Sequence, residues 1–167
     1  MSAPEFSRPL RAHEVGGTAR NVTIDAQPAE CAALAQRFGW LALDQLTASF
    51  VVRAEAAGIR VTGTVRGQGS HACVISADPV AFAATESVSL LLAPAAVAGE
   101  EVELGSEDLD VEPLTSDVID LGEIAAQALA LGVEPFPRAP DAVPPAGVIS
   151  EEAARLAASP FAVLKRD

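Results

Sequence analysis

The chain has 167 residues, of which 50% are hydrophobic and 20% charged, a composition ample for one domain with a sizeable core. Its net charge is −12: seven arginines balance seven acidic residues over residues 1–80, whereas residues 81–167 hold four basic and sixteen acidic residues. These values argue against a chain that is disordered throughout and against a free nucleic-acid binder, which is more often basic, so we expect no DNA partner.

The sequence contains neither a membrane-spanning pattern nor a disulfide framework. No apolar run approaches the roughly 20 residues that cross a bilayer, and residues 1–10 lack the apolar core of a signal peptide. We therefore expect a cytoplasmic protein without a membrane partner. Cys31 and Cys73, the two cysteines, are expected to be reduced and buried.

The first forty residues predict two short strands and a helix. Residues 1–12 contain Pro9, which an edge strand tolerates, and residues 21–26 alternate apolar and polar side chains. Pro28 then opens a helix that extends to residue 38 and stops at Gly39. Trp40 is expected to pack in the core rather than to serve as a stacking platform.

The most regular pattern follows, in the stretches Leu46 to Glu55 and Ile59 to Arg66. Apolar and polar side chains alternate in both, which predicts two strands with one buried face. A two-residue turn at Ala57-Gly58 would place Phe50 opposite Val65 and Glu55 opposite Arg60. Both apolar rows would then share one face, and the charges would pair on the other.

Beyond this hairpin the pattern is less continuous. Gly67 and Gly69 predict a bulge or a close backbone approach. Asp78-Pro79 marks a turn, and residues 85–93 read as a further strand. Residues 94–114 read as a long surface loop, with weak strand character at 102–104 and 109–111.

Residues 117–132 predict a second helix, with a broad apolar stripe that implies burial on more than one side. Asp120 has the capping-box spacing to Glu123, although Asp117 is a rival N-cap. Prolines then force an extended tail, followed by a short helix from Ser150 and a terminal apolar peptide.

Together these elements predict an α+β fold. We expect a curled or barrel-like antiparallel sheet of about five or six strands, packed against the helices at 28–38 and 117–132. Residues 1–134 would form a single domain, and residues 135–167 a proline-rich C-terminal extension.

Catalytic, metal and cofactor sites are not indicated by the sequence. His71 and Cys73 share a strand face, so a thiolate activated by imidazole is conceivable, but no third orienting group is identifiable. Two Cys and two His scattered along the chain make no recognisable zinc spacing. We expect a protein that is not an enzyme and has no cofactor; a small-ligand or metal-binding barrel using the His71 region is an alternative.

Two charged regions are candidates for binding. Arg53, Arg60 and Arg66 fall on the polar face of the hairpin and form either a solvated sheet surface or an RNA phosphate contact. Between residues 100 and 123 there are ten acidic residues and no Lys or Arg, which suits a solvated loop or an adaptor that recognises a basic protein. The protein-binding candidates there are Glu100, Glu101, Glu103, Glu107 and Asp108.

Three segments, covering nearly the whole chain, make the sequence resemble the bacterial YceD family, which is associated with accumulation of large-subunit ribosomal RNA. The first runs from Gln68 through Cys73 to Pro79, and the second is the D-x-x-D-L helix start with its proline exit. The third is the closing P-F-A-V-L peptide. The residues that carry the resemblance are Cys73, Pro79, Asp117, Asp120, Leu121, Pro160 and Phe161.

The resemblance implies a non-enzymatic role in ribosome biogenesis, with ribosomal RNA or basic ribosomal proteins as partners. It supplies no molecular mechanism. Many family members have a second cysteine three positions after the first, where this chain has Ser76, so a metal or redox role for a C-x-x-C pair is doubtful here.

Overall fold

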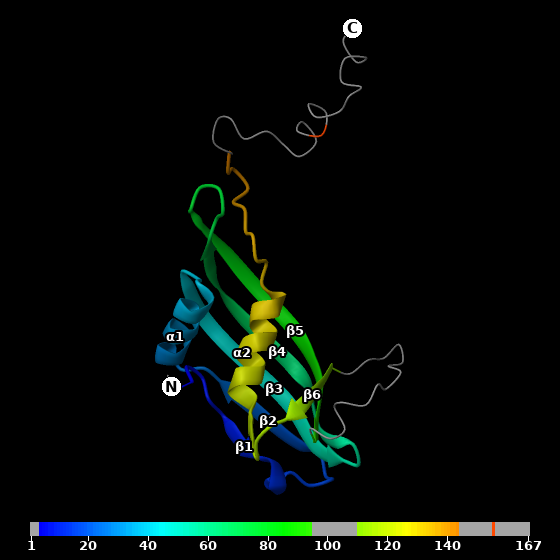
Figure 1. Ribbon diagram of the computed structural model, residues 1–167. Coiled ribbons are helices and arrows are strands. Elements are labelled where there is room, and N and C mark those ends of the chain that lie inside the picture. The colour runs from blue at the N-terminus through cyan, green and yellow to red at the C-terminus, as the bar shows by residue number, and fades with distance from the viewer. Residues whose placement is uncertain (1–3, 95–109, 144–154, 156–167) are drawn as a thin grey trace.

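The computed structural model describes residues 4–94, 110–143 and 155, and the chain folds as the predicted α+β class (Figure 1). A 3-10 turn, Ala12–Glu14, follows the first strand. The helices are α1 (Pro28–Phe38) and α2 (Leu121–Gly132). The strands are β1 (Pro9–Arg11), β2 (Arg20–Asp25), β3 (Ala42–Glu55), β4 (Gly58–Ala72), β5 (Pro79–Pro94), β6 (Asp110–Leu114) and β7 (Val118–Asp120).

The strands form two sheets, one of five strands in the order β2-β3-β4-β5-β6 and one of two, β1-β7. All neighbours are antiparallel except β5 and β6, so the sheet is antiparallel as predicted from β2 to β5 and parallel at its β6 edge. A parallel pair needs a connection of about a dozen residues or more, and residues 95–109, outside the described ranges, supply that length. Among the described strands β2 and β6 are edges, so the sheet is open and not closed into a barrel.

The alternation in β3 and β4 is confirmed by burial, but the predicted register is wrong by two residues. The turn consists of Ala56 and Ala57, and Phe50 lies opposite Gly63 while Glu55 lies opposite Gly58. Gly58 has φ 150°, and a Cβ there would collide with the Leu92 carbonyl. A glycine at this position therefore allows β5 to lie close to β4. Because side chains alternate with period two, a shift by two residues leaves both apolar rows on the buried face.

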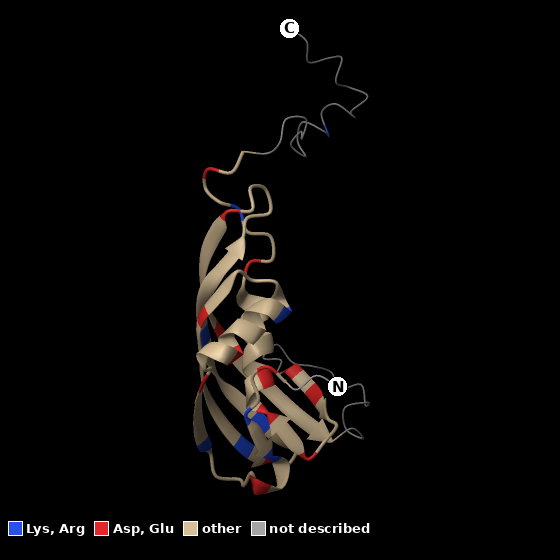
Figure 2. Cartoon of the chain, turned by 90° about the vertical axis from the view of Figure 1, so that its left-hand side faces the viewer, with Lys and Arg blue, Asp and Glu red and all other residues tan. Residues whose placement is uncertain are grey.

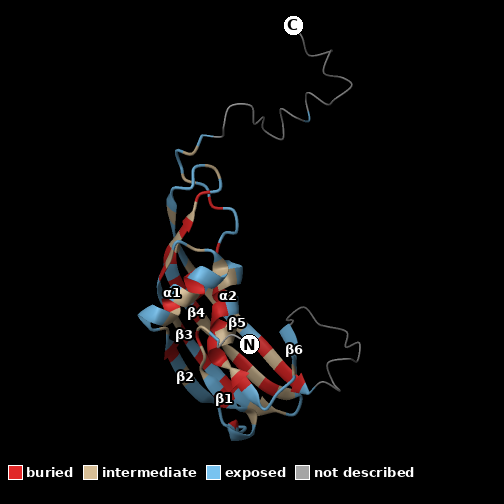
Figure 3. Ribbon diagram, turned by 60° about the vertical axis from the view of Figure 1, so that its left-hand side comes forward, coloured by how far each residue is buried: buried red, intermediate tan, exposed pale blue. Residues whose placement is uncertain are grey.

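Both helices lie on the same side of the large sheet, α1 against β3 and α2 against β4 and β5 (Figure 1). The core fills the space between these layers, and the buried positions gather there in Figure 3. The side chains that are almost completely buried are Phe6, Leu34, Leu46, Phe50, Val52, Val61, Val65, Leu121 and Leu129. Burial of this apolar surface is the main stabilising contribution.

α1 has the predicted bounds, and Gly39 ends it in the left-handed conformation with φ 70°. Trp40 packs against the core, with its ring centroid 4.9 Å from that of Phe38 and 5.0 Å from that of Phe82. Trp40 is thus partly buried against the core, in partial agreement with the predicted core position.

α2 is shorter than predicted, because residues 118–120 form β7 and the helix begins at Leu121. In the β1–β7 pair Leu10 lies opposite Ile119, and both are buried. Asp120 is the N-cap, with its Oδ1 accepting the N–H groups of Gly122 and Glu123 at 3.0 and 3.3 Å. Asp117, the rival, stands before β7 and does not cap the helix.

The close backbone approach predicted at Gly67 and Gly69 is confirmed. A Cβ on Gly67 would collide with the side chain of Leu129 on α2, and one on Gly69 with the Ala42 carbonyl of β3. The bulge lies in the neighbouring strand β3, between Leu43 and Gln45. The glycines thus let α2 and β3 pack closely on β4.

Residues 133–143 follow α2 and pass the end of the β4–β5 hairpin (Figure 1). Pro137 is buried, and its carbonyl accepts the N–H of Val74 at 2.9 Å. The described beginning of the predicted proline-rich extension therefore contacts the turn between β4 and β5. No helix within the described ranges is long and apolar enough to cross a membrane.

Candidate functional site

The three arginines predicted as a phosphate-binding patch are not equivalent. Arg53 and Arg60 lie opposite each other on β3 and β4, and both contact Glu55, with N–O distances of 2.6 and 2.7 Å. The hydrogen bond from Arg60 and the charge of Arg53 lower the pKa of Glu55. Arg66 lies farther along β4, between Thr47 of β3 and Thr85 of β5.

This outer face of the sheet is mainly polar, with Val51 and Leu91 as apolar exceptions, and neither α1 nor α2 lies on it, since both cover the opposite face. Basic and acidic positions are interspersed in the lower half of the ribbon in Figure 2, and the upper half has few charges. Hydroxyl side chains separate the arginine pair from Arg66, namely Ser49, Thr62, Thr64, Ser87 and Ser89, and Thr47 and Thr85 flank Arg66 itself. Such a surface offers hydrogen-bond donors with a modest positive charge.

His71 and Cys73 are both buried, yet no hydrogen bond joins the imidazole to the thiol. The Cys73 Sγ instead accepts N–H groups from Ala139 at 3.3 Å and from Ser76 and Ile75 at 3.4 Å. These hydrogen bonds, that of Ala139 above all, lower the pKa of Cys73 to about 7. The His71 ring packs against Phe82 with centroids 5.3 Å apart.

The region beside His71 contains a cavity of about 310 Å³, lined in part by Phe38, Trp40, Val133 and Pro137. The imidazole is the buried polar group of this lining, so the convergence of polar groups expected of a ligand site is weak. Within residues 4–94 and 110–143, no three His, Cys, Asp or Glu side chains are grouped as metal ligands would be.

The motif residues of the second half occupy structural positions. The Asp120 carboxylate accepts the Ser7 hydroxyl at 2.6 Å and the Arg8 N–H at 2.8 Å in addition to the two N–H groups of α2. Asp117 contacts His13 at 2.8 Å on the surface. Leu121 is 2% exposed, and Pro79 is the first residue of β5. Pro160 and Phe161 lie outside the described residues.

The predicted protein-binding residues Glu100, Glu101, Glu103, Glu107 and Asp108 also lie outside the described residues. The same acidic stretch continues into β6 with Asp110 and Glu112, both exposed. β6 therefore presents these two carboxylates at an edge of the described sheet.

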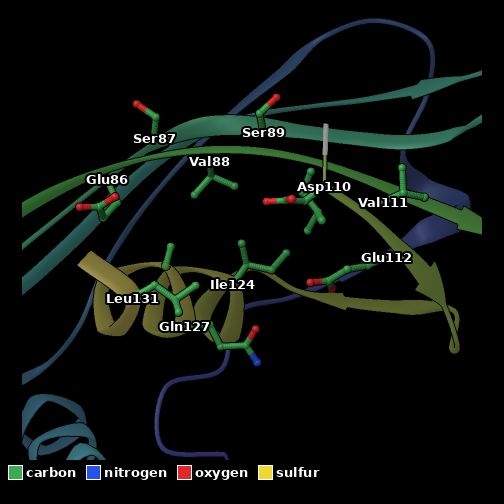
Figure 4. A pocket seen from close by; sticks show the side chains of 12 residues that line it. Glu86, Ser87, Val88, Ser89, Asp110, Val111, Glu112, Ile124, Gln127 and Leu131 are labelled. Atoms are coloured by element: carbon green, nitrogen blue, oxygen red, sulfur yellow. The ribbon is translucent and has the colours of Figure 1, made fainter. Parts of the chain in front are cut away.

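A groove of about 390 Å³ lies between α2 and the β5–β6 edge (Figure 4). In Figure 4, Val88 points from β5 toward Ile124 and Leu131 of α2, whereas Ser87 and Ser89 point away. Leu131 is 89% exposed. Three carboxylates border the groove, those of Glu86, Asp110 and Glu112, and none forms an ion pair within the described part of the chain. We call this surface the α2–β6 groove.

Sequence reasoning missed the α2–β6 groove, because the parallel pairing of β6 brings Asp110 and Glu112 beside α2. One signal was available. The apolar stripe of α2 is broader than the large sheet alone can bury, and Leu131 is the residue of this stripe that remains exposed. Comparisons with protein-family models, with curated proteins and with solved structures give no match to this chain.

Proposed function

We propose that this protein is a YceD-like, non-enzymatic factor of the bacterial cytoplasm that supports accumulation of large-subunit ribosomal RNA. It acts by binding ribosomal RNA, a basic ribosomal protein, or both. The assignment to the large subunit comes from the sequence resemblance. The observation that carries a binding role is the presence of two chemically different surfaces, a hydroxyl- and arginine-bearing sheet face and an acidic groove behind it.

The sheet face is the proposed RNA contact. Its hydroxyl groups and Arg66 suit phosphate and sugar oxygens, and Arg53 and Arg60 would add charge if RNA competes with Glu55 for them. Each exposed pair contributes on the order of 1 kcal/mol or less. Three phosphate contacts would give a slope of about −2 in the logarithm of affinity against the logarithm of salt concentration.

The test is a pull-down with identification of RNA and protein at low and at high salt. Replacing Arg53, Arg60 and Arg66 by Ser is expected to weaken RNA capture and to leave protein capture largely intact. The matched control replaces Arg11, Arg20 and Arg138, three exposed arginines outside this face, and so removes the same charge. Absence of large-subunit components even at low salt would count against the proposal.

The acidic side is tested by the reverse experiment. Neutralising Glu100, Glu101, Glu103, Glu107 and Asp108 is expected to weaken protein capture. RNA capture should not decrease, because these negative side chains repel phosphate and so contribute no RNA contact. If this variant and the arginine variant both bind as the parent does, neither the sheet face nor the acidic segment from Glu100 to Asp108 is the contact. The terminal peptide from Pro160 to Leu164 then becomes the next candidate.

A further inference from the structure

We infer that the α2–β6 groove is a docking site for a short protein segment that presents two or three aliphatic side chains flanked by Lys or Arg. This inference rests on the proposed function and names the site and the chemistry of its protein partner.

The apolar floor is left uncovered by the described part of the chain. Val88 and Ile124 are only partly buried, and Leu131 is 89% exposed. All three line the same space between β5 and α2 (Figure 4). A groove of about 390 Å³ has room for a few aliphatic side chains of a partner, and their burial there would be favourable.

The negative charges that border this apolar floor favour a positively charged partner segment. Glu86, Asp110 and Glu112 border the groove, and no described Lys or Arg pairs with them. With a net charge of −12 on the whole chain, the field attracts cationic segments and repels acidic ones. Lys or Arg beside the aliphatic anchors would give these carboxylates ion-pair partners.

The C-terminal end of α2 strengthens this selection. The last turn of α2 contains no basic residue, although cations are the favourable neighbours of a helix C-terminus. Glu86 lies against Gly132 at this end, where a Cβ would collide with the Glu86 carboxylate. The negative end of the α2 dipole and the Glu86 carboxylate thus lie next to each other. A cationic side chain of a partner would interact favourably with both.

The test uses the full-length, isotope-labelled protein and a defined probe, observed by NMR. The probe is a synthetic peptide of about 15 residues with leucines at helical i, i+3, i+4 and i+7 spacing and lysines elsewhere. A second peptide carries glutamates in place of the lysines. We expect the lysine peptide to shift the amide signals of β5, β6 and α2 around the groove, and the glutamate peptide to bind at least tenfold more weakly.

Two variants separate the apolar and the charge contributions. Leu131→Ser is expected to weaken binding of the lysine peptide roughly tenfold, through lost apolar burial. Its control is Leu41→Ser, since Leu41 is 53% exposed and lies outside the groove. The triple variant E86Q/D110N/E112Q is also expected to weaken binding roughly tenfold. Its control, E14Q/D44N/D78N, changes the net charge equally at exposed sites elsewhere and should bind as the parent does.

Three results would overturn the inference. They are no binding of the lysine peptide at millimolar concentration, signal shifts outside the groove, and equal weakening by the two charge variants. One further variant of the full chain carries Ser in place of Phe161 and Leu164. If the peptide binds only to that variant, the groove takes the chain's own terminal segment and the partner assignment is wrong. The pull-down can still recover large-subunit components in each case, so the proposed function is tested separately.

Discussion

At the residue scale, the carboxylate of Asp120 connects two parts of the chain, the N-terminal segment and the start of α2. It caps α2, accepts the Ser7 hydroxyl and accepts the Arg8 backbone N–H. Asp120→Ala should lower the free energy of unfolding by about 2–4 kcal/mol, because the cap and two further hydrogen bonds are lost together. Urea denaturation measures this change.

Asp117→Ala is the matched control for Asp120→Ala. The side chains of Asp117 and its partner His13 are 64% and 59% exposed, so their pairing is screened by water. The control should change stability by no more than about 0.5 kcal/mol. Equal losses in the two variants would show that the carboxylate of Asp120 has no special role.

The sulfur of Cys73 accepts several hydrogen bonds, and we expect these to change the pH at which its thiol ionises. Three backbone N–H groups lower the pKa of Cys73 to about 7, whereas burial raises the pKa of Cys31. A pH titration of the cysteine carbon-13 Cβ signals should show Cys73 ionising near pH 7. Cys31, in the same spectra, should stay a thiol beyond pH 9 and serves as the internal control.

The same ionisation makes stability depend on pH with a defined sign. Because the pKa of Cys73 is lower in the folded chain than its ordinary value of 9.0, the native state holds the proton less tightly. The resulting stabilisation is complete above about pH 9 and is lost as the pH falls through 7. A Cys73→Ser variant should lack this pH dependence. A Cys73 midpoint at its ordinary value would contradict the hydrogen-bond explanation.

At the scale of elements, the packing of α2 on β4 depends on one pair, Gly67 and Leu129. Leu129 is 1% exposed, and its side chain occupies the space that a Cβ on Gly67 would take. Gly67→Ala should cost roughly 1–3 kcal/mol by overpacking, and Leu129→Ala roughly 2–5 kcal/mol by leaving a cavity. The double variant should lose less than the sum, because each change makes room for the other.

A double-mutant cycle in urea measures that coupling. Gly16→Ala is the control, since nothing lies within 4 Å of a Cβ at that position and its backbone is not left-handed. It should be close to neutral. Strict additivity of Gly67→Ala and Leu129→Ala would mean that the two residues do not compete for space.

At the scale of the whole molecule, two bidentate ion pairs join the N-terminal segment and both helices. Arg8 contacts Glu30 of α1 through two hydrogen bonds of 2.8 Å. Arg37 of α1 contacts Glu123 of α2 at 2.7 and 2.8 Å. The hydrogen bonds from Arg8 and Arg37 lower the pKa of Glu30 and of Glu123, respectively.

Acid should therefore weaken the fold in a defined window. The two carboxyls have folded-state pKa values below their ordinary value of 4.5, so the unfolded chain binds protons first as the pH falls. The urea midpoint should be steady above about pH 5 and should fall between pH 5 and 3. The variant E30Q/E123Q should show a shallower fall, whereas E112Q, which removes an exposed carboxyl without an ion pair among the described residues, should follow the parent.

The sequence by itself determined the local features of the fold, because these depend on neighbours a few positions away. The period-two alternation of β3 and β4 identified their buried faces, even though the turn was placed one residue late and the register therefore differed by two residues. Pro28 and Gly39 indicated the bounds of α1, and the sequence offered Asp120 and Asp117 as caps of α2, of which the structure uses Asp120. The resemblance motifs identified Asp120, Leu121 and Cys73 without revealing that each has a packing or hydrogen-bonding role.

Only the tertiary structure decided which distant segments meet. The sequence pattern predicts a helix over residues 118–120. These residues form a strand instead, because they pair with β1, which lies more than one hundred residues earlier in the chain. β6 lies parallel to β5, and this pairing alone sets Asp110 and Glu112 beside α2 to form the α2–β6 groove. Likewise the N–H of Ala139, 66 residues farther along the chain, donates to the sulfur of Cys73. Contacts of this kind depend on how whole layers pack and on the cost of closing long loops, which no periodicity in the sequence records.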